Sequence, residues 1–333
     1  MKNANKHSNV AFFIPHLGCP HDCSFCNQRE IAGQTLPPSA EEIVKTAQTA
    51  LVQLEGRLLS AEIAFFGGSF TAIPRNYMIT LLETVSPFIG EGKFKGIRIS
   101  TRPDAIDAEI LEILKHYNVS AIELGVQSML DNVLIQNKRG HTAAQVIEAA
   151  KLIKSSGFEL GLQMMTGLYG STPQNDIYTA EQLAILKPDT IRIYPTIVVK
   201  STELEQLYLQ GKYTPQTLEQ ATSLCSELLE LFNINNIKVI RLGLHCTESL
   251  MQSYVAGPLH PAFRELCESK IYFKKAVELL KDNKNPTVTL LVDKSSVSKL
   301  IGQHRRNIIA LEKMFGVKIK VEGGDAQELG IKR

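Results

Sequence analysis

The sequence predicts an α/β fold, a partial (β/α)6 barrel of the TIM type followed by a small α+β domain. Six short runs rich in apolar and β-branched residues alternate with stretches of helical periodicity, as parallel βα units do. Several of these runs are nearly continuous in apolar residues, which is expected of a parallel sheet covered by helices. Beyond the polar segment 281–286, the pattern changes to strand–helix–helix–strand.

The expected strands of the barrel are each followed by a helix. They are Val10–Pro15, Glu62–Phe66, Gly96–Ser100, Ala121–Val126, Glu159–Met165 and Thr190–Tyr194. Helices are expected after Ser39, Pro74, Asp107, Thr142 and Pro173. Ser39 and Glu42 match a capping box, which marks a helix start. Six strands fall short of the eight of a complete barrel, so a partial barrel is predicted.

A further helix near Thr217–Phe232 and a further strand at Lys238–Leu244 follow the six units. In the tail we expect strands at Val288–Val292 and Val317–Val321 around helices at Ser296–Ile301 and Arg306–Phe315. The chain is therefore divided into a barrel (1–236), an extension of the barrel (237–283) and a tail domain (284–333).

Composition places the chain among globular proteins. With 333 residues, 44% of them hydrophobic, it can form a large core plus an appendage. The N-terminus lacks the apolar stretch of a signal peptide, and no window approaches 18 consecutive apolar residues. We therefore expect a cytoplasmic protein without a membrane span, in which clustered thiols serve metal binding or catalysis rather than disulfides.

Charge is distributed unevenly along the chain. The segment from Lys284 to Arg333 holds ten Lys/Arg and five Asp/Glu, a net charge of +5. Because the whole chain carries +2, the remainder carries −3. If the chain binds a polyanion, the tail is the part expected to do so.

Three cysteines lie within eight residues in the loop after the first strand. Cys19, Cys23 and Cys26 have the spacing C-x3-C-x2-C. A disulfide uses two thiols and a tetrahedral zinc site usually has four ligands. Three thiolates can hold three irons of a cubane cluster and leave the fourth iron open to chelate a small molecule. The alternative is a structural zinc knuckle with His16 or His21 as fourth ligand.

The segment "CPHDCSFC", with Phe25 just before the third cysteine, resembles the signature of the radical S-adenosylmethionine (radical SAM) enzymes. The resemblance implies a [4Fe-4S] cluster on Cys19, Cys23 and Cys26, with S-adenosylmethionine (SAM) bound at the open iron. It implies that an electron, from a donor such as flavodoxin or ferredoxin, cleaves SAM to a 5'-deoxyadenosyl radical. The protein's task is then to position the cofactors and exclude water.

Motifs at the ends of the later strands agree with this resemblance. They are "FFGGSF", "RISTRPD", "ELGVQS", "LQMMTGLYGST" and "YPTIVV", and this end of the sheet is where such barrels carry their sites. The resemblance implies the following SAM contacts: Phe13, Phe25, Gly67, Gly68, Ser69, Ser100, Gln127, Arg139, Gln163 and Tyr194. Arg139 suits the carboxylate of SAM and the amides suit hydroxyls. Ser69 replaces the Glu or Thr usual in the family, and a Gly-Gly pair by itself is more often a simple turn.

"STRPD", "ELGVQS" and "GPLHPAFREL" resemble the radical SAM domain of the Elongator catalytic subunit and its short bacterial relatives, over about residues 10–270. The resemblance implies modification of RNA, most plausibly tRNA. The acetyltransferase domain of that subunit is not expected here. Two alternatives stay open: a radical SAM enzyme for a small molecule, like the coproporphyrinogen oxidases, and an RNA-binding protein with a structural or redox-sensing cluster.

The tail segment "KLIGQHRRNIIALEKMFGVKIKV" resembles a KH domain, whose I-G-x-x-G-x-x-I turn clamps single-stranded RNA. Arg305 stands where the second glycine belongs, which puts the conformation of the turn in doubt. The residues predicted to bind RNA are Lys294, Lys299, Gly302, Arg305 and Arg306. The alternative is a basic, solvated helix pair that only packs on the barrel.

The remaining cysteines, Cys225, Cys246 and Cys267, are too widely spaced for a cluster motif and are interpreted as buried structural thiols. A second cluster, supported only by His245 beside Cys246, is the less favoured alternative. His260 is interpreted as a packing or capping residue.

Overall fold

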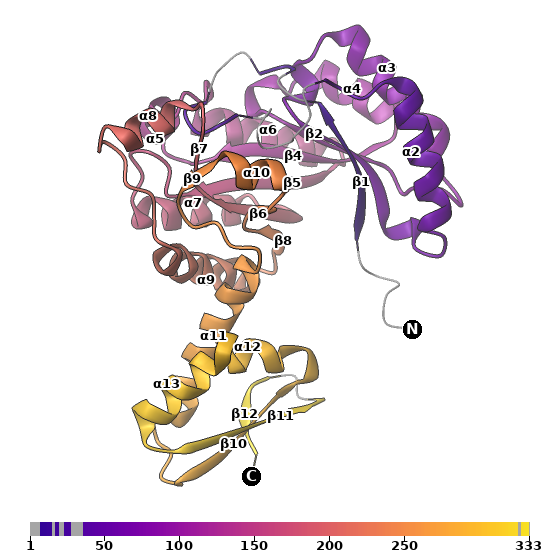
Figure 1. The fold of residues 1–333 in the computed structure, drawn as a ribbon. Coiled ribbons are helices and arrows are strands. Elements are labelled where there is room, and N and C mark those ends of the chain that lie inside the picture. The colour runs from indigo at the N-terminus through magenta and orange to yellow at the C-terminus, as the bar shows by residue number, and fades with distance from the viewer. Residues whose placement is uncertain (1–6, 15–16, 20–22, 28–35, 326–327, 333) are drawn as a thin grey trace.

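The computed structural model of the protein describes residues 7–14, 17–19, 23–27, 36–325 and 328–332. Its main body is a half barrel, a curled parallel sheet of order β1-β2-β3-β4-β5-β6-β8 (Figure 1). The strands are β1 (Ser8–Ile14), β2 (Ala61–Gly67), β3 (Ile97–Thr101), β4 (Val119–Gln127), β5 (Glu159–Thr166), β6 (Thr190–Pro195) and β8 (Lys238–Leu242). The predicted fold class is confirmed, and the strand expected separately at Lys238–Leu244 joins the six as a seventh.

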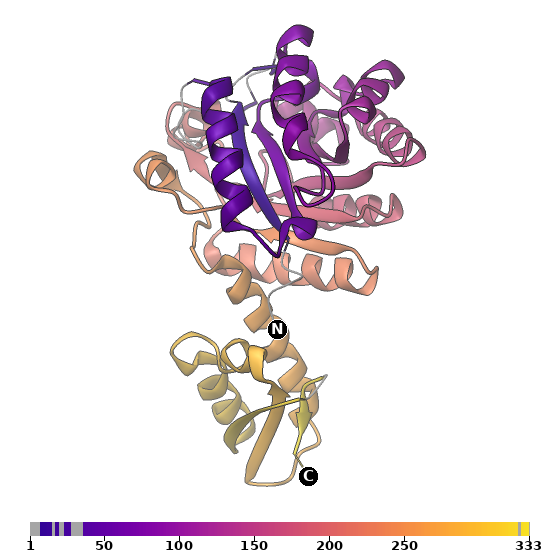
Figure 2. The same ribbon diagram turned by 90° about the vertical axis from the view of Figure 1, so that its right-hand side faces the viewer.

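Helices follow the strands and cover the outer face of the sheet (Figures 1 and 2). The longer ones of the body are α2 (Ala40–Gln53), α3 (Arg75–Val85), α4 (Ala108–His116), α6 (Ala143–Ser155), α7 (Pro173–Ile185), α9 (Leu218–Ile234) and α11 (Phe263–Leu280). Shorter elements are α5 (Asp131–Gln136), α8 (Glu203–Leu209), α10 (Glu248–Ser253), the 3-10 turns η1 (Leu58–Ser60), η2 (Phe70–Ala72), η3 (Ser86–Phe88) and η4 (Pro103–Ala105), and the paired strands β7 (Val198–Val199) and β9 (Tyr254–Ala256).

Capping residues explain where these helices begin. Ser39 accepts a hydrogen bond from Glu42 N, and the Glu42 carboxylate accepts one from Ser39 N at 2.8 Å, so the predicted capping box is confirmed. Thr142 and Thr217 begin α6 and α9 in the same way. No helix in the described part of the chain is long and apolar enough to span a membrane.

The two faces of the sheet differ because side chains alternate along a strand. Ile97 and Ile99 of β3, like Ile122 of β4, point outward into the hydrophobic core under the helices. Arg98 and Glu123 point to the inner face of the half barrel and are 2% and 3% exposed. The inner face therefore holds buried charge instead of a second apolar core.

Arg98 neutralises carboxylates from three other strands. Its guanidinium donates to Glu62 Oε2 and Glu159 Oε1, both at 2.7 Å, and to Glu123 Oε1 at 3.3 Å. Arg192 of β6 donates to both oxygens of Glu123 at 2.6 and 2.9 Å. Burial opposes the charge of Glu62, but Arg98, the Ser120 hydroxyl and His7 together outweigh it and hold the pKa of this carboxyl below its usual range. The network thus joins β2 through β6.

The tail is a small three-stranded sheet with two helices on it. Central β10 (Thr287–Asp293) pairs in parallel with β11 (Lys318–Gly324) and antiparallel with β12 (Gly330–Ile331). The 3-10 turn η5 (Lys294–Ser296), α12 (Val297–Ile301), the 3-10 turn η6 (Gln303–Arg305) and α13 (Arg306–Phe315) connect β10 to β11. The predicted βααβ order is present, with β12 as an addition.

Helix α11 contributes to two hydrophobic cores. Phe263 and Cys267, near its start, lie in the core of the half barrel, whereas Ala276 and Leu280, near its end, lie in the core of the tail. Figure 1 shows α11 running from the body to the tail. The division at 236/237 and 283/284 stays a prediction, and the tail domain as packed includes the last turns of α11.

We expect Arg98→Ala to lower the free energy of unfolding by about 3–5 kcal/mol at neutral pH, because it leaves the buried Glu62 carboxylate without its main cation and removes one cation each from Glu123 and Glu159. The lowered pKa of Glu62 means that its stabilising contribution is present above the unfolded-state pKa and is lost as pH falls through the folded one. The deficit should therefore shrink in acid, as the unpaired carboxyls take up protons. Urea unfolding at pH 8 and at about pH 4, below the ordinary pKa of a glutamate, measures both effects.

The control is Arg75→Ala, which breaks an exposed pair with Glu109 and should cost less than about 1 kcal/mol at either pH. An Arg98→Ala deficit equal to this control, or one that grows in acid, would contradict the interpretation.

Candidate functional site

A cavity of about 150 Å³ lies at the carboxyl ends of strands β2 to β5. The predicted residues that line it are Cys19, Cys23, Phe25, Cys26, Gly67, Gly68, Ser69, Ser100, Gln127, Arg139 and Gln163. Phe13 and Tyr194 are not among its lining residues: the ring of Phe13 lies 6.4 Å from that of Phe66, and Tyr194 lies beside Arg192. The structure therefore brings together segments from four strands and the cysteine loop.

The cysteine loop is anchored through Ser24, which is completely buried. Ser24 Oγ donates to Asn137 Oδ1 at 2.8 Å, and Ser24 N donates to Asn137 O at 3.2 Å. Ser24 O accepts from Leu204 N at 2.7 Å. Asn137, also completely buried, donates from Nδ2 to Tyr169 O at 2.8 Å. These bonds hold the residues between Cys23 and Cys26 against three separate segments of the barrel.

The Gly67–Gly68 pair lets the cysteine loop approach the end of β2. A Cβ at Gly68 would lie 1.9 Å from Leu17 O, so only glycine fits there. The following Ser69 is buried, and its Oγ lies 3.8 Å from Cys19 Sγ. The close contact of the pair is thus with the loop that carries the thiols.

Two arginines face the thiols, and both are more than nine-tenths buried. Arg139 Nη1 donates to Cys23 Sγ at 3.2 Å and Nη2 to Gly125 O at 2.6 Å. Arg102 Nε donates to Asp104 Oδ1 at 2.9 Å. Arg139 Nε and Arg102 Nη1 have no hydrogen-bond partner among the described residues. Burial raises the pKa of Cys19, while Ser69 and the two arginines act in the opposite direction.

These features fit an iron–sulfur cluster with an anionic ligand beside it. Thiolates are the ligands of such clusters, and each binds a different iron, so the three need not converge on one point. Buried guanidinium N–H groups without a partner suit a carboxylate. Within the described residues no three His, Cys, Asp or Glu side chains converge to hold a single metal ion. His16 and His21, the candidate fourth ligands of a zinc knuckle, lie outside the described residues.

Gln127 ends β4 with a φ of 69°, in the left-handed region. Such backbone is costly for a residue with a side chain and tends to occur at functional sites. Its Oε1 accepts from Gln163 Nε2 at 3.4 Å, so both predicted amides face the same cavity.

Sequence reasoning missed four lining residues of the cavity, namely Thr101, Arg102, Glu123 and Gly125. Arg102 belongs to the "STRPD" motif from which only Ser100 was selected. Glu123 is an acidic residue inside a strand that was predicted to be buried. A buried charge of this kind is a sequence signal that could have pointed to the site. It joins the cavity to the charge network below.

The turn of the tail keeps a glycine-like conformation despite Arg305. Gly302 has φ 73° and Arg305 has φ 60° and ψ 20°, so the arginine itself occupies the left-handed region. Lys299 Nζ lies 2.8 Å from Glu268 Oε2, and Arg306 Nη2 lies 3.6 Å from Glu219 Oε2. Two of the predicted RNA-binding cations thus also connect the turn to helices α11 and α9.

Lys294, also predicted to bind RNA, lies 3.4 Å from Asp325 in an exposed ion pair. Cys225 and Cys267 are buried, and burial raises the pKa of Cys225 to about 12, as expected of structural thiols. Cys246 is only half-buried. His260 Nδ1 accepts from Ala262 N at 3.1 Å, a local side-chain-to-backbone bond just before α11 begins.

Comparison with protein families assigns three segments of the chain. The model of the radical SAM superfamily matches residues 13–183, that of the radical SAM C-terminal domain 188–272, and that of the KH domain 287–331. The first match alone covers more than half of the chain.

Individual relatives agree with these matches. An uncharacterized protein of Methanocaldococcus jannaschii is 30% identical over 68% of this chain and 67% of its own. The tRNA uridine(34) acetyltransferase of Dehalococcoides mccartyi is 26% identical over 78% of this chain. The solved structure of the archaeal Methanocaldococcus infernus Elp3 is similar in fold, with a TM-score of 0.63 at 21% identity over 81% of this chain and 63% of that one. The chain spans 64% of the D. mccartyi protein and 24% of the M. jannaschii tRNA uridine(34) acetyltransferase.

We expect Asn137→Ala to leave the Ser24 hydroxyl and the Tyr169 carbonyl unpaired, lowering the free energy of unfolding by about 1–3 kcal/mol. Because the cysteine loop loses its anchor, less iron should be bound per chain after anaerobic reconstitution. Urea unfolding and iron analysis measure the two effects. Asn235→Ala, at the exposed C-terminal end of α9, is the matched control. Unchanged iron content in Asn137→Ala would show that the anchor does not position the thiols.

Proposed function

The chain belongs to the radical SAM superfamily, and on this basis we propose that it modifies RNA, tRNA in particular, with Cys19, Cys23 and Cys26 as cluster ligands. Members of the superfamily use a [4Fe-4S] cluster and SAM, which are the cofactors of this enzyme. When bound, they supply the electron and the 5'-deoxyadenosyl radical that start the reaction. One observation supports the proposed cofactor sites: the three thiols and two incompletely bonded guanidinium groups line the same cavity.

The chain's own residues bind and orient these groups. Arg139 and Arg102 offer N–H donors to the carboxylate of SAM, and their burial strengthens such charge-assisted bonds. Gln127, Gln163 and Ser100 offer amide and hydroxyl groups to the ribose. Phe25 offers an apolar surface at the same cavity. We assign no residue a role in proton transfer.

The RNA substrate is supported by the KH match at 287–331 and by the basic charge of the tail. The turn from Gly302 to Arg305 has left-handed backbone at both of these residues, a conformation that glycine adopts readily, and the flanking Lys299 and Arg306 pair with carboxylates of α11 and α9. Two curated relatives named above are tRNA uridine(34) acetyltransferases, which favours tRNA. An electron donor such as flavodoxin or ferredoxin completes the proposal.

Each of Cys19→Ala, Cys23→Ala and Cys26→Ala should abolish the four-iron cluster, because a site with three thiolates has no spare ligand. Iron and sulfide analysis with electron paramagnetic resonance after anaerobic reconstitution measures this. Cys246→Ala is the control and should keep the cluster. Reconstituted protein that holds only zinc would exclude the proposed cluster.

Arg139→Ala and Arg102→Ala should each weaken SAM binding by about 1.5–3 kcal/mol, and Gln127→Ala by about 0.5–1.5 kcal/mol. Calorimetry on the reconstituted protein, with iron content checked in parallel, measures the affinity. Arg75→Ala is the control, since Arg75 is exposed on α3 away from the cavity. Wild-type SAM affinity in all three variants would show that these residues do not contact SAM.

Arg305→Gly should weaken binding of single-stranded RNA and reduce the salt slope, d log K/d log[salt], by about 0.7, one contact's share. The geometry offers no compensating gain, because Arg305 already has a conformation that glycine adopts. Fluorescence anisotropy at several salt concentrations measures this, again with Arg75→Ala as control. If wild type and Arg305→Gly bind RNA equally, Arg305 does not contact RNA; if neither binds RNA, a small-molecule substrate becomes the better hypothesis.

A further inference from the structure

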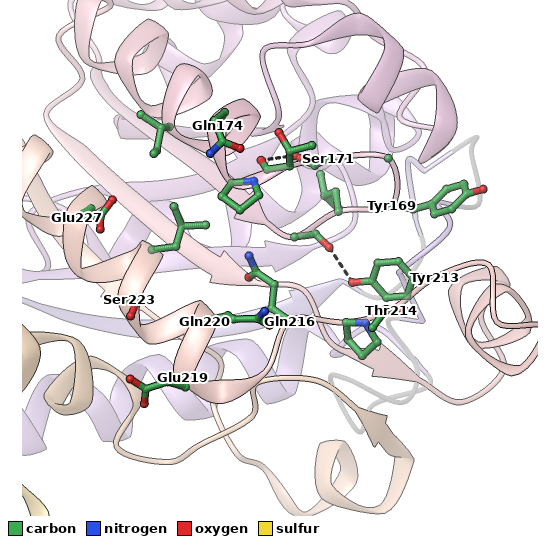
Figure 3. Close-up of a pocket in the computed structure, with 18 of the residues that line it drawn as sticks. Tyr169, Ser171, Gln174, Tyr213, Thr214, Gln216, Glu219, Gln220, Ser223 and Glu227 are labelled. Atoms are coloured by element: carbon green, nitrogen blue, oxygen red, sulfur yellow. Dashed lines mark hydrogen bonds between the residues drawn. The ribbon is translucent and has the colours of Figure 1, made fainter.

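A groove of about 820 Å³ lies between the start of α7 and the segment that leads into α9 (Figure 3). This volume is within the range of small-ligand sites, about 300–1,000 Å³. The groove shares no lining residue with the cavity of the cysteines. The reaction as proposed above assigns it no role.

The lining chemistry suits a nucleobase. Tyr169 and Tyr213 stand edge to face at one end, with ring centroids 6.3 Å apart. Tyr213 Oη donates to Gly167 O at 2.7 Å and the residue is buried, whereas Tyr169 is half-buried and leaves part of the residue exposed at that end of the groove. The amides of Gln174 and Gln216 both donate and accept, which matches the mixed edge of a base better than a phosphate, which only accepts.

One of these amides lacks a partner. Gln216 points from the segment before α9 toward the β5–α7 loop (Figure 3), and its buried Oε1 has no hydrogen-bond partner within the described chain. An unsatisfied buried acceptor costs about 1–3 kcal/mol, and a rotation of the Gln216 amide toward the groove would let a ligand's N–H recover this cost. An amino or imino group of a base supplies such a donor.

The two ends of the groove reach the two parts of the site. At one end, Tyr169 O accepts from Asn137, which anchors the cysteine loop, and Tyr169 packs with Phe25 against the same small apolar cluster. At the other end, Glu219 pairs with Arg306, the first residue after the turn of the tail. The groove thus extends from the cysteine loop to the KH turn.

The rim does not repel a polyanion. Its carboxylates are Glu219 and Glu227, and both are in ion pairs. Their partners are Lys270, Lys274 and Arg306, and Lys212 also lines the groove. The rim therefore holds four positive charges and two negative ones. An RNA strand held at the turn can therefore pass along α9 without a charge penalty.

We propose that this groove binds one nucleobase of a single-stranded RNA whose neighbouring nucleotides are held by the tail turn. The inference rests on the proposed function, because it takes RNA as the substrate. The base held here is an accessory one, since the groove is separate from the cavity of the cysteines.

The experiment tests whether the effect of removing one RNA base depends on the side chains that line the groove. The full chain is titrated with fluorescein-labelled single-stranded RNAs of about twelve nucleotides, each lacking one base but keeping its phosphates. Gln216→Ala should fold normally, because its Oε1 has no partner to lose within the described chain. Tyr169→Ala is a second variant that removes the ring and keeps the carbonyl bonded to Asn137. Gln53→Ala, exposed at the end of α2, is the matched control.

In wild type and Gln53→Ala, removal of the base at one position outside the KH-bound nucleotides should lower affinity about 5- to 10-fold. In Gln216→Ala and Tyr169→Ala, intact RNA should bind more weakly and loss of that same base should cost little more. If the cost of base removal is the same in all proteins, the groove inference is wrong while RNA binding through Arg305 still stands. If wild type binds no RNA, the proposed function fails and this inference with it.

Discussion

The guanidinium of Arg98 is 2% exposed among three carboxylates, and an unpaired charge could not remain in that position. Strands β2 to β5 must therefore keep the register that brings these groups together. Glu123 belongs both to this network and to the lining of the cysteine cavity, since Arg98 and Arg192 bind its oxygens from below. The charges on the inner face thus fix the register of the strands whose ends form the site.

Beside this charge network, hydrogen bonds of two buried side chains connect parts of the chain that are far apart in sequence. Ser24 lies between two of the thiols, and Asn137 joins it to Tyr169 at the head of the groove. Helix α11 makes the second connection, because its two ends lie in the cores of the barrel and the tail. Together these contacts connect the cysteine loop to the groove, and the barrel to the tail that carries the KH turn.

Much of the fold could be predicted because it depends on local periodicity. The six strands and the helix starts at Ser39, Thr142 and Thr217 follow from alternation of residues and from capping chemistry. The cysteine spacing likewise indicated a cluster. The same local logic could not find Arg102, because the sequence does not tell which of the polar residues after a strand faces the cavity. Phe13 and Tyr194, predicted to contact SAM, lie outside the lining of this cavity, and their contact with SAM stays a prediction.

The sequence by itself determined the α/β class, the order of the elements, the thiol triplet and the basic KH-like tail, because each is encoded in neighbouring residues. Only the tertiary structure decided that Arg305 adopts the conformation of a glycine and that Lys299 and Arg306 meet carboxylates of the barrel. It also decided that Gln216, whose Oε1 has no partner in the described part of the chain, lines a groove beside the tail. These features depend on pairs of groups brought together from distant segments. Their energies arise from burial and charge pairing, which no local pattern of residues records.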